Sequence, residues 1–98
     1  MAHKLIFNAS IPADLAAAIS YYEDISPALA NRFRTAVDRR LDEIAKRPES
    51  FPGDVTPIRF AKLDQFPYLI FFVLKSDLVS VIAILHGSTA PGMWRNRT

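Results

Sequence analysis

The most continuous apolar positions of the chain fall in its C-terminal third, in residues 66–74 and 78–86. Both segments are rich in β-branched, aromatic and aliphatic side chains, and the polar residues 75–77 between them suit a tight turn. This pattern predicts a β-hairpin at the centre of a sheet. Both alternating sets of residues in the first segment are apolar, so both faces of that strand need cover. A chain of this length comfortably supplies helices for only one face.

The N-terminal part of the chain predicts a short strand followed by a helix. Residues 5–9 form the strand candidate, Ser10 is suited to cap a helix, and Pro12 fits the first helical turn. Asp14 lies near the expected helix N-terminus, where a negative charge is favourable. Apolar residues then recur at three- and four-residue spacing, which predicts about three helical turns with a narrow apolar stripe. The stripe consists of Leu15, Ala18, Ile19 and Tyr22.

A second, longer helix is predicted from Pro27 to Arg47. Ser26 supplies a hydroxyl cap, Pro27 fits the first helical position, and Pro48 ends the helix. At 1.5 Å per residue this helix is about 30 Å long, which is enough to cross a small sheet completely. We expect the two helices to form an antiparallel hairpin. The buried stripe of the second helix consists of Leu29, Phe33, Val37, Leu41 and Ile44.

The remaining segments complete the predicted fold. Residues 48–57 hold three of the seven prolines and are expected to form a loop. Residues 58–63 alternate as a strand with one wet face would, and residues 89–98 form a polar tail without periodicity. The order β-α-α-β-β-β predicts one α+β domain over residues 1–98. In this sandwich, a helical hairpin packs on a small, mostly antiparallel sheet.

Composition narrows the class of protein. The chain is 50% hydrophobic and 22% charged, which is typical of a folded globular domain. The absence of cysteine excludes disulfides and thiolate chemistry, and no apolar segment reaches the roughly 18 residues that span a membrane. No leader-like apolar segment precedes the first strand, so we expect a cytoplasmic protein without a membrane partner. A net charge of +2 is too mild to predict direct, specific nucleic-acid binding.

Recognisable catalytic constellations are nearly absent. With two histidines and no cysteine, the chain lacks the residues of a zinc cluster or a cysteine nucleophile, and it has no Gly-rich phosphate loop. We therefore assign no catalytic residue, no metal site and no cofactor. Asp38, Asp42 and Glu43 lie among basic residues on the wet side of the second helix, where i,i+4 pairing explains them. A basic stripe along a phosphate backbone is the alternative, which the interleaved acids weaken.

Five residues are candidates for contacts with another molecule. His86 closes the last strand, where it can act as a general base, anchor the tail, or simply end the strand. Trp94, followed by Arg95 and Arg97, has a composition enriched at interaction hot spots, unless the tryptophan folds back onto the sheet edge. Arg59 places positive charge near the open sheet face or forms a surface ion pair.

Short motifs recur in a specific order over almost the whole chain. They are Ala13-Asp14-Leu15, Tyr21-Tyr22, residues 26–33, Ile44 with Pro48, Phe51-Pro52, Ile58-Arg59, Phe66-Pro67-Tyr68, and His86 with Pro91 and Trp94. Together they resemble the ParE/RelE toxin superfamily of bacterial type II toxin–antitoxin systems. The resemblance implies a RelE-like sandwich and a small antitoxin that wraps the toxin and neutralises it.

An antitoxin would also cover the spare apolar face of the sheet. We therefore expect the central strand and the second helix to contribute contacts to it. The expected antitoxin-binding residues are Leu69, Phe71, Val73, Phe33 and Val37.

The superfamily contains two modes of action. RelE-like members cut messenger RNA in the ribosome with basic side chains on the sheet and a tyrosine near the C-terminus. By resemblance, two arginines and the tyrosine of that set fall on Leu69, Ser88 and Trp94, whose side chains cannot take those roles. Of that catalytic set, only one basic residue has a rough match in this chain, at Lys62. ParE-like members lack the set and bind DNA gyrase, trapping its cleaved-DNA state.

The resemblance thus predicts a ParE-like, non-enzymatic toxin that poisons DNA gyrase or a related topoisomerase. One alternative is a ribosome-dependent ribonuclease that uses Arg59, Lys62 and His86 in a nonstandard site. Another is a toxin fold that has lost toxicity and persists as an antitoxin-binding module. The expected contacts of the ParE-like toxin with its target are Trp94, Arg95, Arg97, Arg59 and His86.

Overall fold

A computed structural model describes residues 2–53 and 57–88 of the chain. In chain order the elements are β1 (Lys4–Phe7), α1 (Ile11–Ile25), α2 (Pro27–Lys46), the 3₁₀ helix η1 (Pro48–Ser50), β2 (Ile58–Lys62), β3 (Tyr68–Lys75) and β4 (Leu78–His86). This is the predicted β-α-α-β-β-β order. The short helix η1 lies within the predicted loop.

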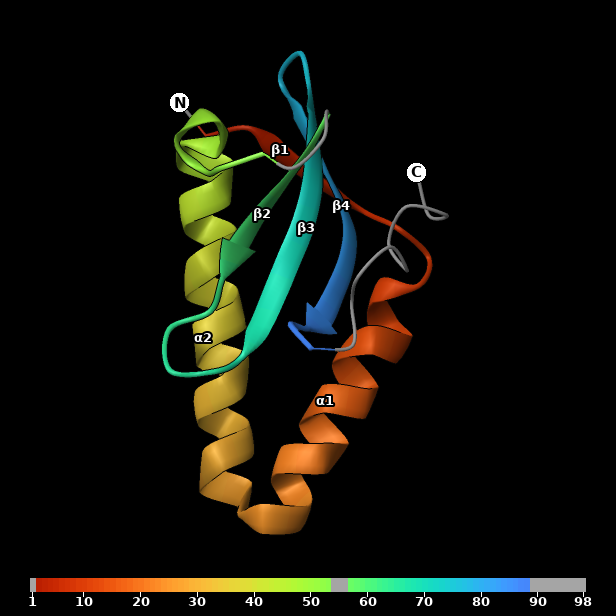
Figure 1. Ribbon diagram of the computed structural model, residues 1–98, viewed down its shortest axis with the longest axis vertical. Helices are drawn as coiled ribbons and strands as arrows, with labels where there is room; N and C mark the ends of the chain where they lie inside the picture. The colour runs from red at the N-terminus through yellow and green to blue at the C-terminus, as the bar shows by residue number, and fades with distance from the viewer. Residues whose placement is uncertain (1, 54–56, 89–98) are drawn as a thin grey trace.

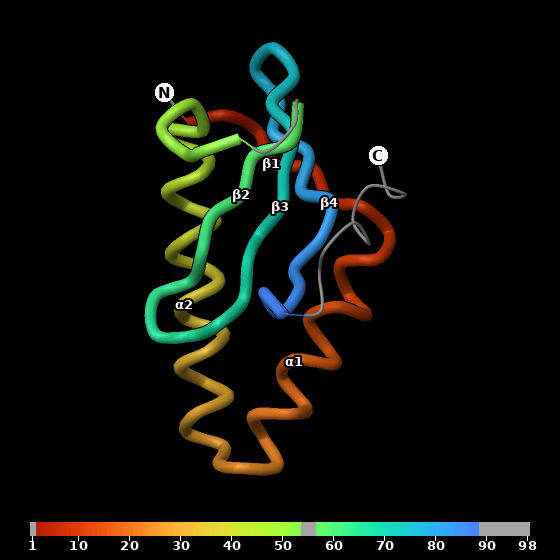
Figure 2. The backbone as a smooth tube through the Cα atoms, viewed as in Figure 1, coloured from red at the N-terminus to blue at the C-terminus, as the bar shows by residue number. Residues whose placement is uncertain are grey.

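The strands form a four-stranded sheet in the order β1-β4-β3-β2. β3 and β4 form the predicted central hairpin, β2 pairs antiparallel with β3, and β1 lies parallel to β4. The strands lie across the helical hairpin (Figure 1), whose two helices run side by side in opposite directions (Figure 2). β1 and β4 can pair in parallel because the long connection between them, which includes the helical hairpin, returns the chain to the same end of the sheet. The predicted α+β sandwich is confirmed.

β3 is apolar on both faces, as its sequence predicts. Ile70 and Phe72 lie in the main core between the sheet and the helices, whereas Phe71 and Val73 are buried on the opposite face. We call the buried residues of that opposite face the second-face cluster. Its members are Ile58, Phe71, Val73, Ile82 and Ala83.

A β-bulge in β4 places two consecutive residues on the same face. Phe71 pairs with Ala83. The next residue of β3, Phe72, pairs with Val81, so Ile82 is an extra residue on β4. Ile82 and Ala83 therefore both join the second-face cluster, while Val81 belongs to the main core. The sequence pattern does not indicate the bulge, because all of these positions are apolar.

The two helices differ in how they begin. Ser26 caps α2 as predicted, because its hydroxyl oxygen accepts a hydrogen bond from the Leu29 N–H at 3.3 Å. The prediction that Ser10 caps α1 is wrong, since Ser10 makes no capping hydrogen bond. Instead, Asn8 Oδ1 accepts hydrogen bonds from the backbone N–H and the hydroxyl of Ser10, at 2.9 and 2.8 Å. Asn8 thus organises the turn before α1.

Aromatic side chains join the helical hairpin to the sheet. Phe33 of α2 has 0% of its surface exposed. Its ring centroid lies 5.2 Å from that of Tyr22 on α1 and 5.3 Å from that of Phe66, just before β3. The ring of Tyr68 on β3 lies 5.2 Å from the Phe33 ring. Phe33 is therefore the point where both helices and the sheet meet.

Phe33→Ala is expected to destabilise the protein strongly, because it opens a cavity between these rings. Truncation of a buried phenylalanine lowers the free energy of unfolding by about 3–5 kcal/mol. Phe7→Ala is the control, since Phe7 on β1 is 51% exposed. Its expected change is about 0.5 kcal/mol. Urea unfolding followed by circular dichroism measures both variants, and equal losses would contradict the central position of Phe33.

Asp14 links α1 to the exposed edge of β4. β1 ends at Phe7, opposite Val81, so β4 continues beyond its parallel neighbour. There, the Asp14 carboxylate oxygen Oδ2 accepts a hydrogen bond from the Ile84 backbone N–H at 3.0 Å. A side chain of α1 therefore satisfies a backbone group that a longer β1 would have paired.

Asp14→Ala is expected to lower the free energy of unfolding by about 1–3 kcal/mol, because the partly buried Ile84 N–H loses its acceptor. Asp24→Ala removes an exposed carboxylate from the same helix and is expected to change stability by about 0.5 kcal/mol or less. Asp14→Asn keeps a carbonyl acceptor and should cost less than the alanine variant. Indistinguishable urea midpoints for Asp14→Ala and Asp24→Ala would refute this link.

Candidate functional site

The predicted target contacts fall into two groups. Trp94, Arg95 and Arg97 lie outside the described residues, so their role stays a prediction. Arg59 and His86 lie on β2 and β4, and the hydrogen bonds that each side chain makes can be described.

Backbone carbonyls hold the Arg59 side chain. Its Nη1 donates hydrogen bonds to the carbonyl oxygens of Phe51 at 2.8 Å and of Glu49 at 3.4 Å. Close by, the Phe60 N–H donates to the Pro52 carbonyl at 3.1 Å. These bonds tie β2 to the segment around the end of η1. Among the described residues, Arg59 thus bonds to carbonyl oxygens and to no carboxylate, and these bonds give its guanidinium a structural role.

His86 anchors the residues that follow β4. Its Nδ1 accepts a hydrogen bond from the Ser88 backbone N–H at 3.0 Å and lies 2.8 Å from the Ser88 hydroxyl oxygen. Because Nδ1 acts as an acceptor from the backbone, the neutral ring carries its proton on Nε2. The ring also packs edge-to-face on Tyr68, with centroids 5.4 Å apart. This geometry agrees with the anchoring role considered for His86.

A groove of about 590 Å³ lies beside His86, between α1 and the ends of β3 and β4. We call it the α1 groove. Its lining includes Tyr21 and Ile25, whose exposed fractions are both 60%. Burial, and then neighbouring phenols, raise the pKa values of Tyr22 and Tyr68, so both stay protonated at neutral pH. The groove therefore offers apolar surface, the neutral phenols of Tyr22 and Tyr68, and the Asp14 carboxylate, which accepts from the Ile84 N–H.

The three side chains of the alternative ribonuclease site do not converge. Arg59 and Lys62 are three residues apart on β2, so they point to opposite faces of the sheet. His86 is on the helix side, packed on Tyr68. Arg59 shares that side but pairs in register with Phe72, about 13 Å along β3 from Tyr68. In this arrangement the three groups cannot act together on one phosphate.

The residues expected to contact an antitoxin occupy two buried regions. Phe33 and Val37 lie in the main core, where packing between the helices and the sheet accounts for their apolar character. Phe71 and Val73 belong to the second-face cluster, and the half-buried Leu69 packs against it. Contact of these residues with an antitoxin stays a prediction.

Ion pairs account for most of the charge considered on α2. Lys46 pairs with Asp42 at 2.9 Å, as the i,i+4 spacing predicts. Arg40 pairs with Glu43 at 3.0 Å and also with Asp64 at 2.7 Å. Sequence reasoning missed Asp64, because it comes from the connection between β2 and β3 and reaches α2 only in the folded chain.

The described part of the chain lacks two further features. Within residues 2–53 and 57–88, no three histidine, aspartate or glutamate side chains lie together as a potential metal-ligand set. No helix in these same ranges combines the length and the apolar character needed to cross a membrane.

Known proteins share this fold. A solved structure titled "Chromosomal ParDE TA system from P. aeruginosa" has a TM-score of 0.74 and 19% sequence identity, covering 86% of this chain and 95% of that chain. At this identity, the likeness shows the fold alone. No curated protein sequence matches the chain at a significant level. The family model of the ParE toxin of the type II toxin–antitoxin system parDE matches residues 5–91, and the chain therefore belongs to the ParE toxin family.

Proposed function

We propose that this chain is the toxin of a type II toxin–antitoxin pair that arrests bacterial growth by binding and poisoning DNA gyrase or a related topoisomerase in the cytoplasm. Membership of the ParE toxin family supports the toxin assignment. The separation of Arg59, Lys62 and His86 supports topoisomerase poisoning over RNA cleavage. Cleavage of RNA needs cationic and proton-transferring groups around one phosphate, whereas poisoning of a topoisomerase needs only a binding surface.

The main target contacts in this proposal are Trp94, Arg95 and Arg97. A tryptophan beside two guanidinium groups combines residue types that dominate binding energy at interfaces. His86 supports these contacts by holding Ser88, the last described residue before the tail. Its hydrogen bonds make it a positioning residue for the start of the tail.

The proposed partner that neutralises the toxin is a cognate antitoxin. The solved structure with this fold is named for a ParDE system, which motivates the proposal. The α1 groove, with Tyr21 and Ile25 exposed, offers apolar surface, and so do the partly buried Phe60, Leu69 and Leu85 at the second-face cluster. We infer that the antitoxin covers these two surfaces, because covering apolar area favours association.

Controlled expression of the chain in bacteria, with and without the adjacent small open reading frame, tests this function. The expected result is growth arrest with DNA breaks, relieved by the neighbouring gene, because a poisoned topoisomerase leaves its DNA cleaved. Growth and the DNA damage response are followed together. Arrest with codon-specific cuts in messenger RNA and intact DNA would contradict topoisomerase poisoning, and the absence of arrest would contradict the toxin assignment.

The combined variant Trp94→Ala, Arg95→Ala, Arg97→Ala is expected to weaken target binding by at least roughly tenfold, because each hot-spot side chain contributes more than about 1 kcal/mol. Inhibition of purified gyrase in a supercoiling assay measures this loss, and circular dichroism checks that the variant folds. A folded triple variant with undiminished inhibition would remove the tail from the proposal.

Lys62→Ala is the control for that experiment. Lys62 is exposed on β2 and belongs only to the ribonuclease alternative, so its loss is expected to leave toxicity unchanged. A loss of toxicity in this variant, with normal stability, would instead support the ribonuclease mechanism.

A further inference from the structure

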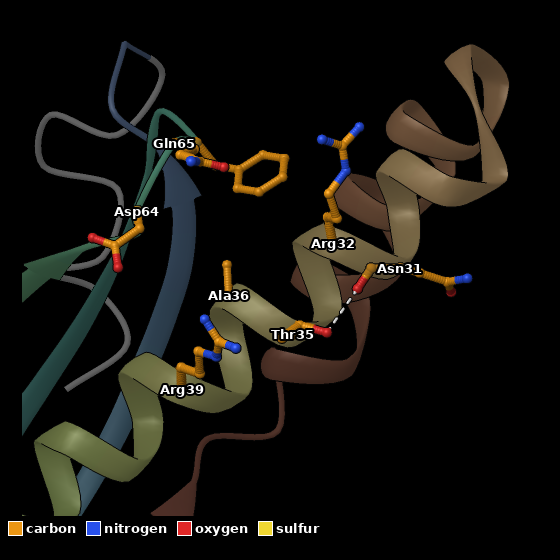
Figure 3. A pocket seen from close by; sticks show the side chains of 8 residues that line it. Asn31, Arg32, Thr35, Ala36, Arg39, Asp64 and Gln65 are labelled. Atoms are coloured by element: carbon orange, nitrogen blue, oxygen red, sulfur yellow. Dashed lines mark hydrogen bonds between the residues drawn. The ribbon is translucent and has the colours of Figure 1, made fainter.

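A second hollow, separate from the α1 groove, lies between α2 and the connection from β2 to β3. It has a volume of about 400 Å³, and we call it the α2 cleft. Figure 3 shows Arg32 and Arg39 on either side of Ala36, with Asp64 and Gln65 across the opening. The cleft is large enough for a few side chains of a partner, but not for a folded domain.

The residues that α2 contributes lie on one stripe of the helix. They are Asn31, followed by Arg32, Thr35, Ala36 and Arg39, which stand at positions i, i+3, i+4 and i+7. The two arginines are therefore about 10.5 Å apart along the helix axis. Smaller residues lie between them, so the centre of the stripe can be approached closely.

Arg32 and Arg39 have no partner for their charge within the described part of the chain. Neither side chain forms an ion pair or a hydrogen bond with another residue of the ranges 2–53 and 57–88. By contrast, Arg34 pairs with Glu23, at 3.7 Å, and donates to Asn31 Oδ1.

The acidic residue of the cleft is already compensated. Asp64 Oδ1 accepts a hydrogen bond from Arg40 Nη2 at 2.7 Å, and Arg40 is not among the residues that line the cleft. Arg40 also pairs with Glu43, so this ion pair offsets the charge of Asp64 in part, and the two arginines of the lining outnumber its one carboxylate. The cleft therefore carries a net positive charge that favours an acidic ligand.

The inner wall of the cleft is apolar. Phe66 is 5% exposed and Ala36 is half-buried. The hydroxyl of Thr35 donates a hydrogen bond to the Asn31 carbonyl oxygen at 3.1 Å, so it does not require a partner from outside. A short apolar side chain placed between the two arginines would thus meet matching surface.

We propose that the α2 cleft binds an acidic helical segment of a partner polypeptide. Two carboxylates of that segment, seven residues apart, pair with Arg32 and Arg39, and a short apolar side chain between them packs on Ala36 and Phe66. A helix alongside α2 repeats the same axial spacing, and carboxylates suit the fork of donors on each guanidinium. The separation of the arginines favours such a ligand over a single oxoanion. Identification of the partner as the antitoxin rests on the proposed function, whereas the chemistry of the segment does not.

A synthetic peptide tests this proposal with the full chain. The probe is a capped, alanine-rich helical peptide with two glutamates seven residues apart and a leucine between them, and its twin carries glutamine at both acidic positions. Fluorescence anisotropy of labelled peptide measures affinity. The acidic peptide is expected to bind roughly tenfold more tightly than its twin, and the Arg32→Gln, Arg39→Gln variant is expected to lose that preference.

Arg47→Gln is the matched control, since Arg47 is exposed at the end of α2 and outside the cleft. It is expected to keep the preference for the acidic peptide. The proposal is overturned if the wild-type chain does not distinguish the two peptides, or if Arg47→Gln weakens binding as much as the double variant. Competition by inorganic phosphate at concentrations equal to the dissociation constant of the peptide would also overturn it, in favour of a general anion site.

A growth assay separates this proposal from the proposed function. The Arg32→Glu, Arg39→Glu chain is expected to stay toxic but to escape neutralisation by the adjacent gene, whereas Arg47→Glu is still neutralised. Full neutralisation of the double variant would overturn use of the cleft by the antitoxin while leaving the toxin assignment intact. If the neighbouring gene does not neutralise the wild-type chain, the antitoxin assignment fails, and the peptide measurement still decides the chemistry of the cleft.

Discussion

The β3 strand buries apolar side chains on both of its faces, and the helical hairpin covers only one of them. This constraint fixes most of the architecture. β3 lies inside the sheet, between β4 and β2, because a strand that is apolar on both faces gains most from neighbours on both edges. The bulge at Ile82 adds a further apolar side chain to the face away from the helices. β2, β3 and β4 all contribute buried side chains to that face.

A short β1 determines how α1 is attached. Because β1 ends opposite Val81, no strand from residues 2–53 or 57–88 lies beside the later part of β4 on that edge. The Ser10 hydroxyl donates to the Ile82 carbonyl at 3.4 Å, and Asp14 accepts from the Ile84 N–H at 3.0 Å. Side chains around the start of α1 thus satisfy the strand edge, which would otherwise invite another strand. They also hold the helix where it forms one wall of the α1 groove.

The element order could be predicted from the sequence because each apolar period matches one kind of element. The start of α1 could not be predicted, because Ser10 has the chemistry of a cap and only the fold shows that Asn8 engages it.

For the candidate site, the sequence already contains one decisive fact: Arg59 and Lys62 are three residues apart on one strand and must point to opposite faces of the sheet. The α2 cleft could not be predicted from the sequence. Tertiary contacts, such as that of Arg40 with Asp64, decide which arginines of α2 remain unpaired.

The proposed binding mechanism also agrees with how the described polar groups are used. An acid or base that transfers protons at neutral pH works best with a pKa near neutrality, but burial moves the pKa values of Tyr22 and Tyr68 upward, away from it. Asp14 holds the edge of β4, Arg59 holds the segment around the end of η1, and His86 holds Ser88. Each of these groups already has a structural partner. Affinity for other proteins must then come from exposed apolar surface and from arginines that the fold leaves unpaired.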